Sequence, residues 1–218
     1  MANDYRNRFV TPETAAKAVR SGDWVDYGFG AGFPELMDKA LAKRKDELKD
    51  VKIRGGLVIR PRIEVVESDP EQSAFTYYSW HIGDYERKLQ SRGLCQFIPM
   101  ILRSLPELYR RHIRVDVAFV PVSRPDENGF CGLGISNYAW RTIFEQARTV
   151  IFEINERLPR LQGVDGSTAS ICRRQTTLWR ASMNPFLSVL TGIRPPLTSR
   201  SQSAWWRRFL TGPFSPLA

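Results

Sequence analysis

The chain of 218 residues contains only three cysteines and two histidines. Cys95, Cys131 and Cys172 are widely spaced, and none of them belongs to a Cys-x-x-Cys pair or lies near a pair of histidines. This pattern argues against both a zinc site and a disulfide framework. We therefore expect three reduced, buried thiols and no bound metal.

Long apolar runs are also missing. No hydrophobic stretch approaches the ~20 residues that are needed to cross a bilayer, and the first residues, MANDYRNRF, lack the apolar core of a secretory signal. Hydrophobic residues nevertheless make up 42% of the chain, which is enough for a well-packed domain. We expect a cytoplasmic protein without a membrane partner.

Acidic residues and lysines are absent from one end of the chain. From Gly166 onward there are seven Arg but no Lys, Asp or Glu, whereas the other 25 basic residues nearly balance the 23 acids. The first 165 residues thus carry +2 of the net charge of +9. A basic, Trp-bearing arm could bind RNA or an acidic membrane, which leaves a non-catalytic basic-tailed binding protein as an alternative. No strand or helix period persists there, so we expect an irregular tail at residues 166–218 and no nucleic-acid partner.

The clearest pattern in the sequence lies between residues 115 and 160. Dense apolar runs at residues 115–122 and 150–154 indicate strands that are buried on both faces. Between them lie a turn rich in Gly, Pro and Asp and a helical period over residues 137–148, with Asn137 as its N-cap. This β-α-β unit predicts a parallel sheet.

Strands and helices also alternate in the first 111 residues. Thr11 and Pro12 form the start of a first helix, because Thr is a good N-cap and Pro is favoured at the first helical position. The apolar periods predict helices over residues 12–20, 35–49, 84–91 and 106–111, and strands over residues 23–27, 51–59 and 75–79. Such alternation favours an α/β fold, an open sandwich around a parallel sheet.

Three parts of the chain together resemble one family: residues 115–160, the triplet Ser79, Trp80 and His81, and the early stretch SGDWVDYGFGAGFPELMDKALAKR. The collinear series, over residues 8–163, is similar to the acetyl-CoA hydrolase and transferase family, and within it to butyryl-CoA:acetate and 4-hydroxybutyrate CoA-transferases. The resemblance implies the amino-terminal domain of an α/β CoA-transferase that moves coenzyme A between short-chain acyl groups and acetate through a glutamyl-CoA thioester. An acyl-CoA hydrolase of the same family is the alternative.

Coenzyme A would then be a substrate rather than a permanently bound cofactor, and the oligomeric state stays open. The resemblance places the nucleophilic Glu beyond the family-like part of this chain, so we assign no catalytic residue and expect no turnover by the chain alone. The substrate-cleft candidates are the residues of three loops, namely Gly28, Gly30, Gly32, His81, Gly132 and Gly134.

The first of these glycine turns allows two interpretations. Phe33 replaces the third glycine of a GxGxxG fingerprint, which argues against an NAD site. The backbone N–H groups could instead meet an anion or a carbonyl oxygen at a helix N-terminus, or the turn could be purely structural. His81 could likewise orient a carboxylate or cap a buried carbonyl.

Three pairs of residues are candidates for acid–base or nucleophilic work, although most acids in such places are ordinary surface groups. They are Glu86 with Arg87, Asp126 with Glu127, and Glu153 with Glu156.

The resemblance ends where the composition changes. In the family the strand that ends in a Leu-Pro-Arg-like triplet leads to a segment His-x-Ser-Glu-x-Asp-Tyr-Ile-Val-Glu-Gly, which is missing here. Permitted codons for residues 175–181, read one base earlier, spell Asp-Tyr-Ile-Val-Glu-Gly, and the same shift extends through residues 169–187 into a family-like segment. We therefore interpret residues 166–218 as an out-of-frame tail on a truncated chain.

Overall fold

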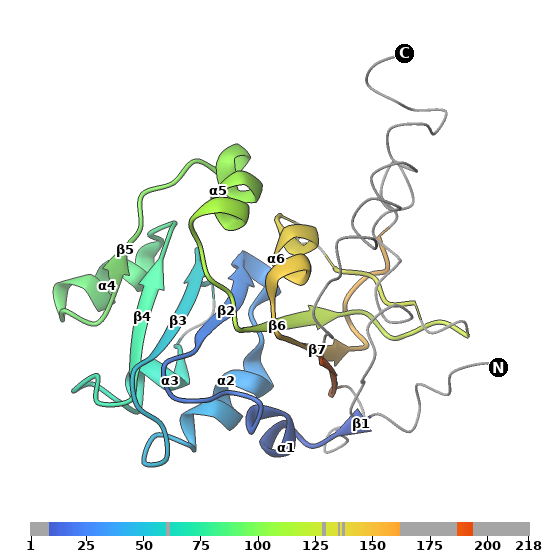
Figure 1. The fold of residues 1–218 in the computed structure, drawn as a ribbon, viewed down its shortest axis with the longest axis horizontal. Coiled ribbons are helices and arrows are strands. Elements are labelled where there is room, and N and C mark those ends of the chain that lie inside the picture. Colours follow the sequence, from blue (N-terminus) through green and yellow to red (C-terminus); the bar gives the residue numbers. More distant parts are fainter. Residues whose placement is uncertain are drawn as a thin grey trace.

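The computed structural model describes residues 9–59, 62–127, 130–134, 136 and 138–161, and the backbone of residues 187–193. Within these residues eight strands form one sheet in the order β1-β8-β7-β6-β2-β3-β4-β5 (Figure 1). The strands are β1 (Phe9–Val10), β2 (Trp24–Phe29), β3 (Val51–Gly56), β4 (Phe75–Ser79), β5 (Gln96–Phe97), β6 (Val117–Val122), β7 (Thr149–Asn155) and β8 (Leu187–Ile193).

Six neighbouring strands, from β7 through β6, β2, β3 and β4 to β5, are parallel. All residues of β6 and nearly all of β3 and β7 are buried, because helices cover both faces of this part of the sheet. The open parallel α/β sheet that the sequence predicts is thus confirmed. β8 and β1 extend it with two antiparallel strands.

Helices cover the sheet on both faces (Figure 1). They are α1 (Pro12–Ala16), α2 (Glu35–Ala42), α3 (Glu64–Glu67), α4 (Asp84–Ser91), α5 (Leu105–Arg111) and α6 (Trp140–Gln146), with short 3-10 turns η2 (Gly30–Gly32) and η3 (Leu102–Ser104). In one core cluster the sheet packs against α1 to α4, with Met37 and Leu41 buried from α2. In the other cluster it packs against α5 and α6, with Tyr109 and Ile143 buried. No helix among the described residues is long and apolar enough to span a membrane.

Several predicted elements have different bounds in the structure. α2 ends at Ala42, and the chain then continues in turns, where the Arg44 guanidinium donates to the carbonyl oxygens of Ala16 and Val19. α6 begins at Trp140 with Ala139 in the N-cap position, so the assignment of the cap to Asn137 is wrong. Asn137 itself lies outside the described residues. β1, α3 and β5 were not predicted, since two to four residues are too few to show a period.

β8 corrects the expectation for the tail. We predicted no regular element after residue 166, whereas residues 187–193 form a strand that pairs along the whole of β7, from Thr149 opposite Ile193 to Asn155 opposite Leu187. A backbone ladder needs a free strand edge rather than a side-chain period, and the outer edge of β7 offers one. The other tail residues lie outside the described part.

The cysteines also differ from expectation. Cys95 is a free, buried thiol, and burial raises its pKa to about 12. Cys131 is buried and disulfide-bonded, so the prediction of a reduced thiol is wrong there. Spacing along the chain could not reveal this bond because a disulfide depends on the distance between residues in the folded chain. The prediction for Cys172 lies outside the described residues.

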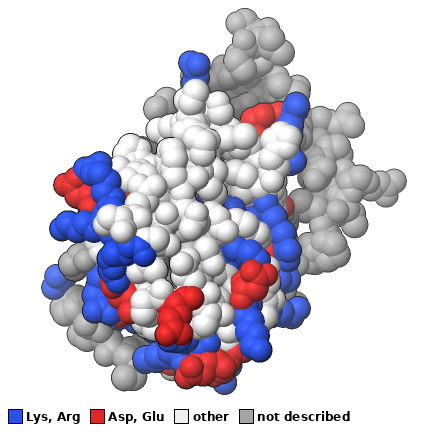
Figure 2. Space-filling view, turned by 90° about the vertical axis from the view of Figure 1, so that its left-hand side faces the viewer, with Lys and Arg blue, Asp and Glu red and all other residues white. Residues whose placement is uncertain are grey.

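One side of the molecule exposes uncharged surface. Figure 2 shows the side that carries α4 and β5, where Lys, Arg, Asp and Glu frame a broad uncharged area. Phe97 in β5, and Ile101 and Leu102 after it, are 50%, 62% and 57% exposed. Exposed apolar side chains that lie close together in sequence are candidates for contacts between domains or subunits.

Candidate functional site

The site candidates gather at one edge of the parallel sheet. From β2 the strand order proceeds through β3, β4 and β5 on one side and through β6 and β7 on the other, so the order reverses between β2 and β6. Ligands of open α/β sheets bind outside the carboxyl ends of the strands at such a point. The six candidates lie at the ends of β2, β4 and β6 or in the loops that follow, and the structure therefore places them at this carboxyl edge.

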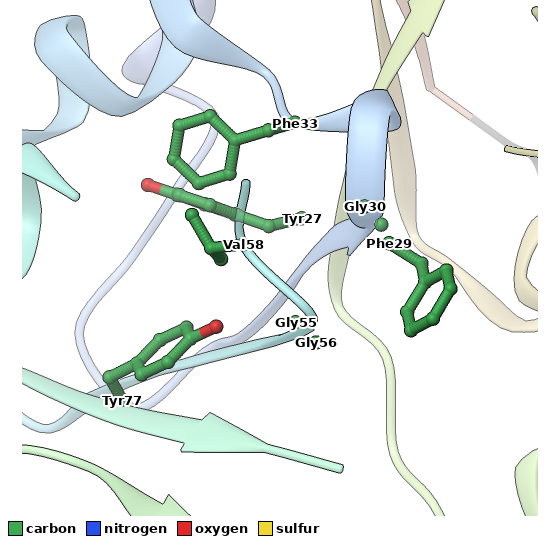
Figure 3. A pocket seen from close by; sticks show the side chains of 9 residues that line it. Tyr27, Phe29, Gly30, Phe33, Gly55, Gly56, Val58 and Tyr77 are labelled. Carbon is green, nitrogen blue, oxygen red and sulfur yellow. The ribbon is translucent and has the colours of Figure 1, made fainter. Parts of the chain in front are cut away.

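Gly28 changes the direction of β2. Its φ is +83°, and the pairing of β2 with β3 is irregular between Asp26 and Phe29. Tyr27 belongs to the core cluster beneath α1 to α4, whereas Phe29, two residues later, packs on the cluster beneath α5 and α6. Figure 3 shows Phe29 pointing away from Tyr27 and Phe33. A regular strand would place Tyr27 and Phe29 on the same face, so the glycine redirects the chain into the turn.

The turn after β2 contacts the loop after β6. The Gly32 N–H donates to Ser136 Oγ at 2.9 Å, and the Trp140 indole N–H donates to the Ser136 carbonyl oxygen, also at 2.9 Å. A methyl group added at Gly32 would lie 2.7 Å from Ser136 Cβ, and one at Gly28 would lie 2.8 Å from the Gly32 carbonyl oxygen. Both positions therefore need glycine for close approach.

Gly132 and Gly134 lie in the loop after β6. The Gly132 N–H donates to Ser123 Oγ at 2.8 Å, which closes this loop onto the end of β6. Gly134 has a φ of +64° and lies against Leu158. These contacts explain both glycines structurally, and they bring Gly132 and Gly134 to the same edge as the turn after β2.

His81 is exposed just beyond β4. Its carbonyl oxygen accepts the Leu57 N–H at 2.9 Å, and its ring meets the edge of Phe29 at 5.7 Å. Leu57 has a φ of +48°, which is unusual for a leucine and indicates backbone strain in the loop after β3. The next residue, Val58, donates its N–H to Glu86 Oε1 at 2.7 Å. The main chain of His81 thus positions a neighbouring loop, while its side chain is exposed and contacts Phe29.

An aromatic cluster that the sequence did not reveal lies between these loops. The rings of Phe29 and Trp80 are stacked, with 4.6 Å between their centroids. The ring centroid of Tyr138 lies 5.5 Å from that of Trp80 and 5.0 Å from that of Trp140. The Trp80 indole N–H is buried without a partner among the described residues. The end of β2, the loop after β4 and the start of α6 with the residues before it therefore bring their rings together in one aromatic cluster beside the glycine turns.

A narrow space lies on the other face of the turn (Figure 3). It is too narrow for a water molecule, and it is lined by Tyr27, Gly28, Phe29, Gly30, Phe33, Gly55, Gly56, Val58 and Tyr77. Burial raises the pKa of the Tyr27 and Tyr77 hydroxyls well above the ordinary value, so both phenols stay neutral. The space is a packing gap that a small movement of the loop could enlarge.

The candidate carboxylates divide into buried and accessible groups. Glu86 is buried and accepts the N–H groups of Val58 and Gly83, which makes it a cap of α4. Glu127 and Glu156 are exposed or partly exposed, and Arg87 forms an exposed pair with Asp84. Asp126 pairs with Arg160 and accepts the Phe130 N–H within its own loop.

Glu153 differs from the other candidates because it reaches the first turn of α2. One oxygen, Oε2, accepts the N–H groups of Leu36 and Met37, each at 3.0 Å. Burial raises the pKa of Glu153 to about 7. Glu153 thus occupies the N–H groups of Leu36 and Met37, and Ser136 occupies that of Gly32, so these three groups are not available to a ligand in this structure.

A buried ion pair fixes β2 beside β3. Asp26 and Arg54 are adjacent in the register, and the guanidinium pairs with the carboxylate through Nη2 and through Nε at 3.2 Å. The Tyr109 hydroxyl on α5 donates to Asp26 Oδ1 at 2.6 Å. The charges in these strands are visible in the sequence, but their pairing depends on the strand register.

The sequence model of the acetyl-CoA hydrolase/transferase N-terminal domain matches residues 1–172. The chain belongs to this family. Among curated relatives, the butyryl-CoA:acetate CoA-transferase of Anaerostipes caccae is 41% identical over 161 residues, or 73% of this chain. The probable butyrate:acetyl-CoA coenzyme A-transferase of Syntrophomonas wolfei is 38% identical over 164 residues, or 75% of this chain. The chain spans 36% of the length of each relative.

Solved structures share the fold of this chain. The crystal structure of RipA from Yersinia pestis matches with a TM-score of 0.66 at 26% identity, over 76% of this chain and 41% of that chain. The α/β fold and the family expected from the sequence are thus confirmed.

Proposed function

We propose that this chain is the amino-terminal part of an acyl-CoA:carboxylate CoA-transferase that uses a short-chain acyl-CoA, such as acetyl-, butyryl- or 4-hydroxybutyryl-CoA, with acetate. The main support is family membership, together with the gathering of three candidate loops at the carboxyl edge. Coenzyme A is a substrate in this proposal, and no permanently bound cofactor is needed. We further propose a cytoplasmic location.

The chemistry proceeds through covalent intermediates on a glutamate. The carboxylate attacks the acyl-CoA carbonyl and expels the CoA thiolate, which leaves a mixed anhydride. The thiolate then attacks the glutamyl carbonyl, releases the first acid and forms the glutamyl-CoA thioester; acetate reverses these steps to give acetyl-CoA. Such a reaction needs a cleft that excludes water, because hydrolysis of the thioester competes with transfer.

This chain would supply one wall of the cleft. We assign the turn at Gly28, Gly30 and Gly32, the loop at Gly132 and Gly134, and His81 to that wall. The aromatic cluster would provide the apolar surface beside the acyl group. The nucleophilic Glu would come from the second part of the longer family protein. We therefore expect no transfer by the isolated chain, since effective molarities worth ~7–11 kcal/mol depend on both sides being positioned.

A chimera tests this proposal. Residues 1–161 replace the matched part of the Anaerostipes caccae enzyme, and CoA transfer from butyryl-CoA to acetate is measured beside release of free CoA without acetate. We expect acetate-dependent transfer by the chimera and none by the isolated chain. A folded chimera that only hydrolyses butyryl-CoA would favour the hydrolase alternative.

Two further results would contradict the proposal. One is a folded chimera without either activity. The other is full turnover by the isolated chain that one Glu or Asp substitution within residues 1–160 abolishes. The binding-protein alternative predicts instead a salt-dependent complex with RNA that requires residues 166–218.

A further inference from the structure

Glu153 is a buried acid at the end of β7. Its side chain is 2% exposed, and no Lys or Arg forms an ion pair with it within the described ranges. A buried carboxylate without a cation is costly unless hydrogen bonds compensate it. Here the compensation comes from two N–H groups of the first turn of α2, where the helix dipole also favours negative charge.

Glu153 lines a small cavity beside the glycine turn. It has about 30 Å³ of space open to water and lies between Glu153, Asn155, Pro121 and the residues Ala31 and Phe33 of the glycine turn. Space of this size is enough for a water molecule beside polar groups.

We propose that Glu153 is a positioning residue, whose carboxyl fixes the first turn of α2 and thereby the glycine turn of the candidate cleft. The geometry supports this role because residues 30–34 lead directly into α2, so the chain that forms the cleft wall ends at the two N–H groups that Glu153 binds. The relevance to catalysis rests on the proposed function. The positioning itself does not.

Protonation should affect this contact. The charged groups that face Glu153 are Glu35 and Asp38 from α2, and both oppose its ionisation; the Tyr27 hydroxyl on β2 also lies near it. Glu153 therefore binds a proton more tightly in the folded chain, with a pKa of about 7, than when it is hydrated, with its ordinary value of 4.5. Any opening that hydrates Glu153 becomes easier as the pH rises between these values, and the effect levels off above about pH 7.

Hydrogen exchange of the Leu36 and Met37 amides tests the proposal in the isolated chain. After correction for intrinsic exchange, the protection of both amides should fall with rising pH between about pH 5 and 7. Glu153→Gln keeps an acceptor oxygen but cannot titrate. The slope of log protection against pH in this variant should therefore be shallower than in the wild type by about one log unit per pH unit. In Glu153→Ala, which removes the acceptor, protection should be at least about tenfold lower throughout.

Two controls separate a local effect from general loss of stability. Glu156→Gln, the same change at an exposed position, should reproduce the wild-type profile. The Ala74 and Phe75 amides, which Asp69 binds, should keep their own pH dependence in Glu153→Gln. Unchanged protection of the Leu36 and Met37 amides in a folded Glu153→Ala variant would overturn the proposal.

The chimera adds the functional test. Glu153→Ala should lower kcat/KM for butyryl-CoA by about tenfold or more, whereas Glu153→Gln should stay within about threefold of the parent near pH 7. Full kcat/KM in a folded Glu153→Ala chimera would exclude a positioning role in the cleft. An inactive parent chimera would contradict the proposed function and leave the exchange result valid.

Discussion

At the scale of single residues, polar groups inside the sheet connect its layers. Asp26 and Arg54 lie on adjacent central strands, and Tyr109 joins them from α5. A buried ion pair of this kind stabilises the folded chain little more than apolar residues of similar shape would. Loss of one partner, however, leaves an uncompensated buried charge and lowers the free energy of unfolding.

Arg54→Met should therefore destabilise the chain by about 3–5 kcal/mol, measured by urea unfolding. Lys43→Met, which breaks the exposed pair of Lys43 with Glu13, is the control and should cost less than about 1 kcal/mol. Equal effects of the two substitutions would show that the Asp26 carboxylate is not buried as described.

The sequence revealed these residues only in part. Asp26, Arg54 and Glu153 stand out as charges within apolar strands, and Glu153 was among the candidate carboxylates. Their partners could not be predicted, because the N–H groups that Glu153 binds lie 116 and 117 residues away in the chain. Strand register and helix placement determine such contacts, and no local pattern records them.

At the scale of elements, the turn after β2 is the feature whose conformation depends most on glycine. Gly22 and Gly28 have nearly the same φ, +81° and +83°, but only Gly28 is crowded by its surroundings. They form a matched pair for separating backbone strain from packing.

Gly22→Ala should cost about 1–2 kcal/mol of unfolding free energy, because an L-residue disfavours positive φ. Gly28→Ala should cost about 1–3 kcal/mol more, because its methyl group would meet the Gly32 carbonyl and the Trp140 ring. Unfolding curves of both variants test this difference. Similar losses would mean that the turn shifts easily and that close packing is not required.

Elements with a local period and clear bounding turns were predictable, and very short or edge elements were not. The strand at residues 75–79 and the helix at residues 84–91 agree with the structure, since a local period and clear turns bound them. β8 was missed because its pairing depends on the free edge of β7, which no pattern within residues 187–193 indicates.

Pairing of β8 can be tested by removal of residues 162–218. The β7 amides that face β8 should then exchange at least about tenfold faster, while amides of β3, which lies between two strands, should change little. Limited proteolysis with trypsin is a second test of the pairing. Early cleavage after Arg173, Arg174, Arg180 or Arg200, with a resistant fragment that ends near Arg160 and unchanged β7 exchange, would contradict the β8 pairing.

At the scale of the whole molecule, the tail and the family domain have different compositions. We propose that a shift of reading frame near residues 163–166 produced this difference. The nucleotide sequence should continue, in the frame one base earlier, through the family-like segment and into a second α/β domain with a catalytic Glu and a glycine-rich CoA loop. A stop codon within a few codons in that frame would contradict the proposal.

The location of the cleft is the central claim, and hydrogen exchange of the chimera with and without butyryl-CoA tests it most directly. We expect butyryl-CoA to protect residues 28–32, 79–83 and 132–134, because these loops share the carboxyl edge of the sheet. The loops at the opposite edge, such as residues 43–50, should be unchanged. Protection confined to that opposite edge, or absent from all three carboxyl-edge loops in an active chimera, would contradict the claim.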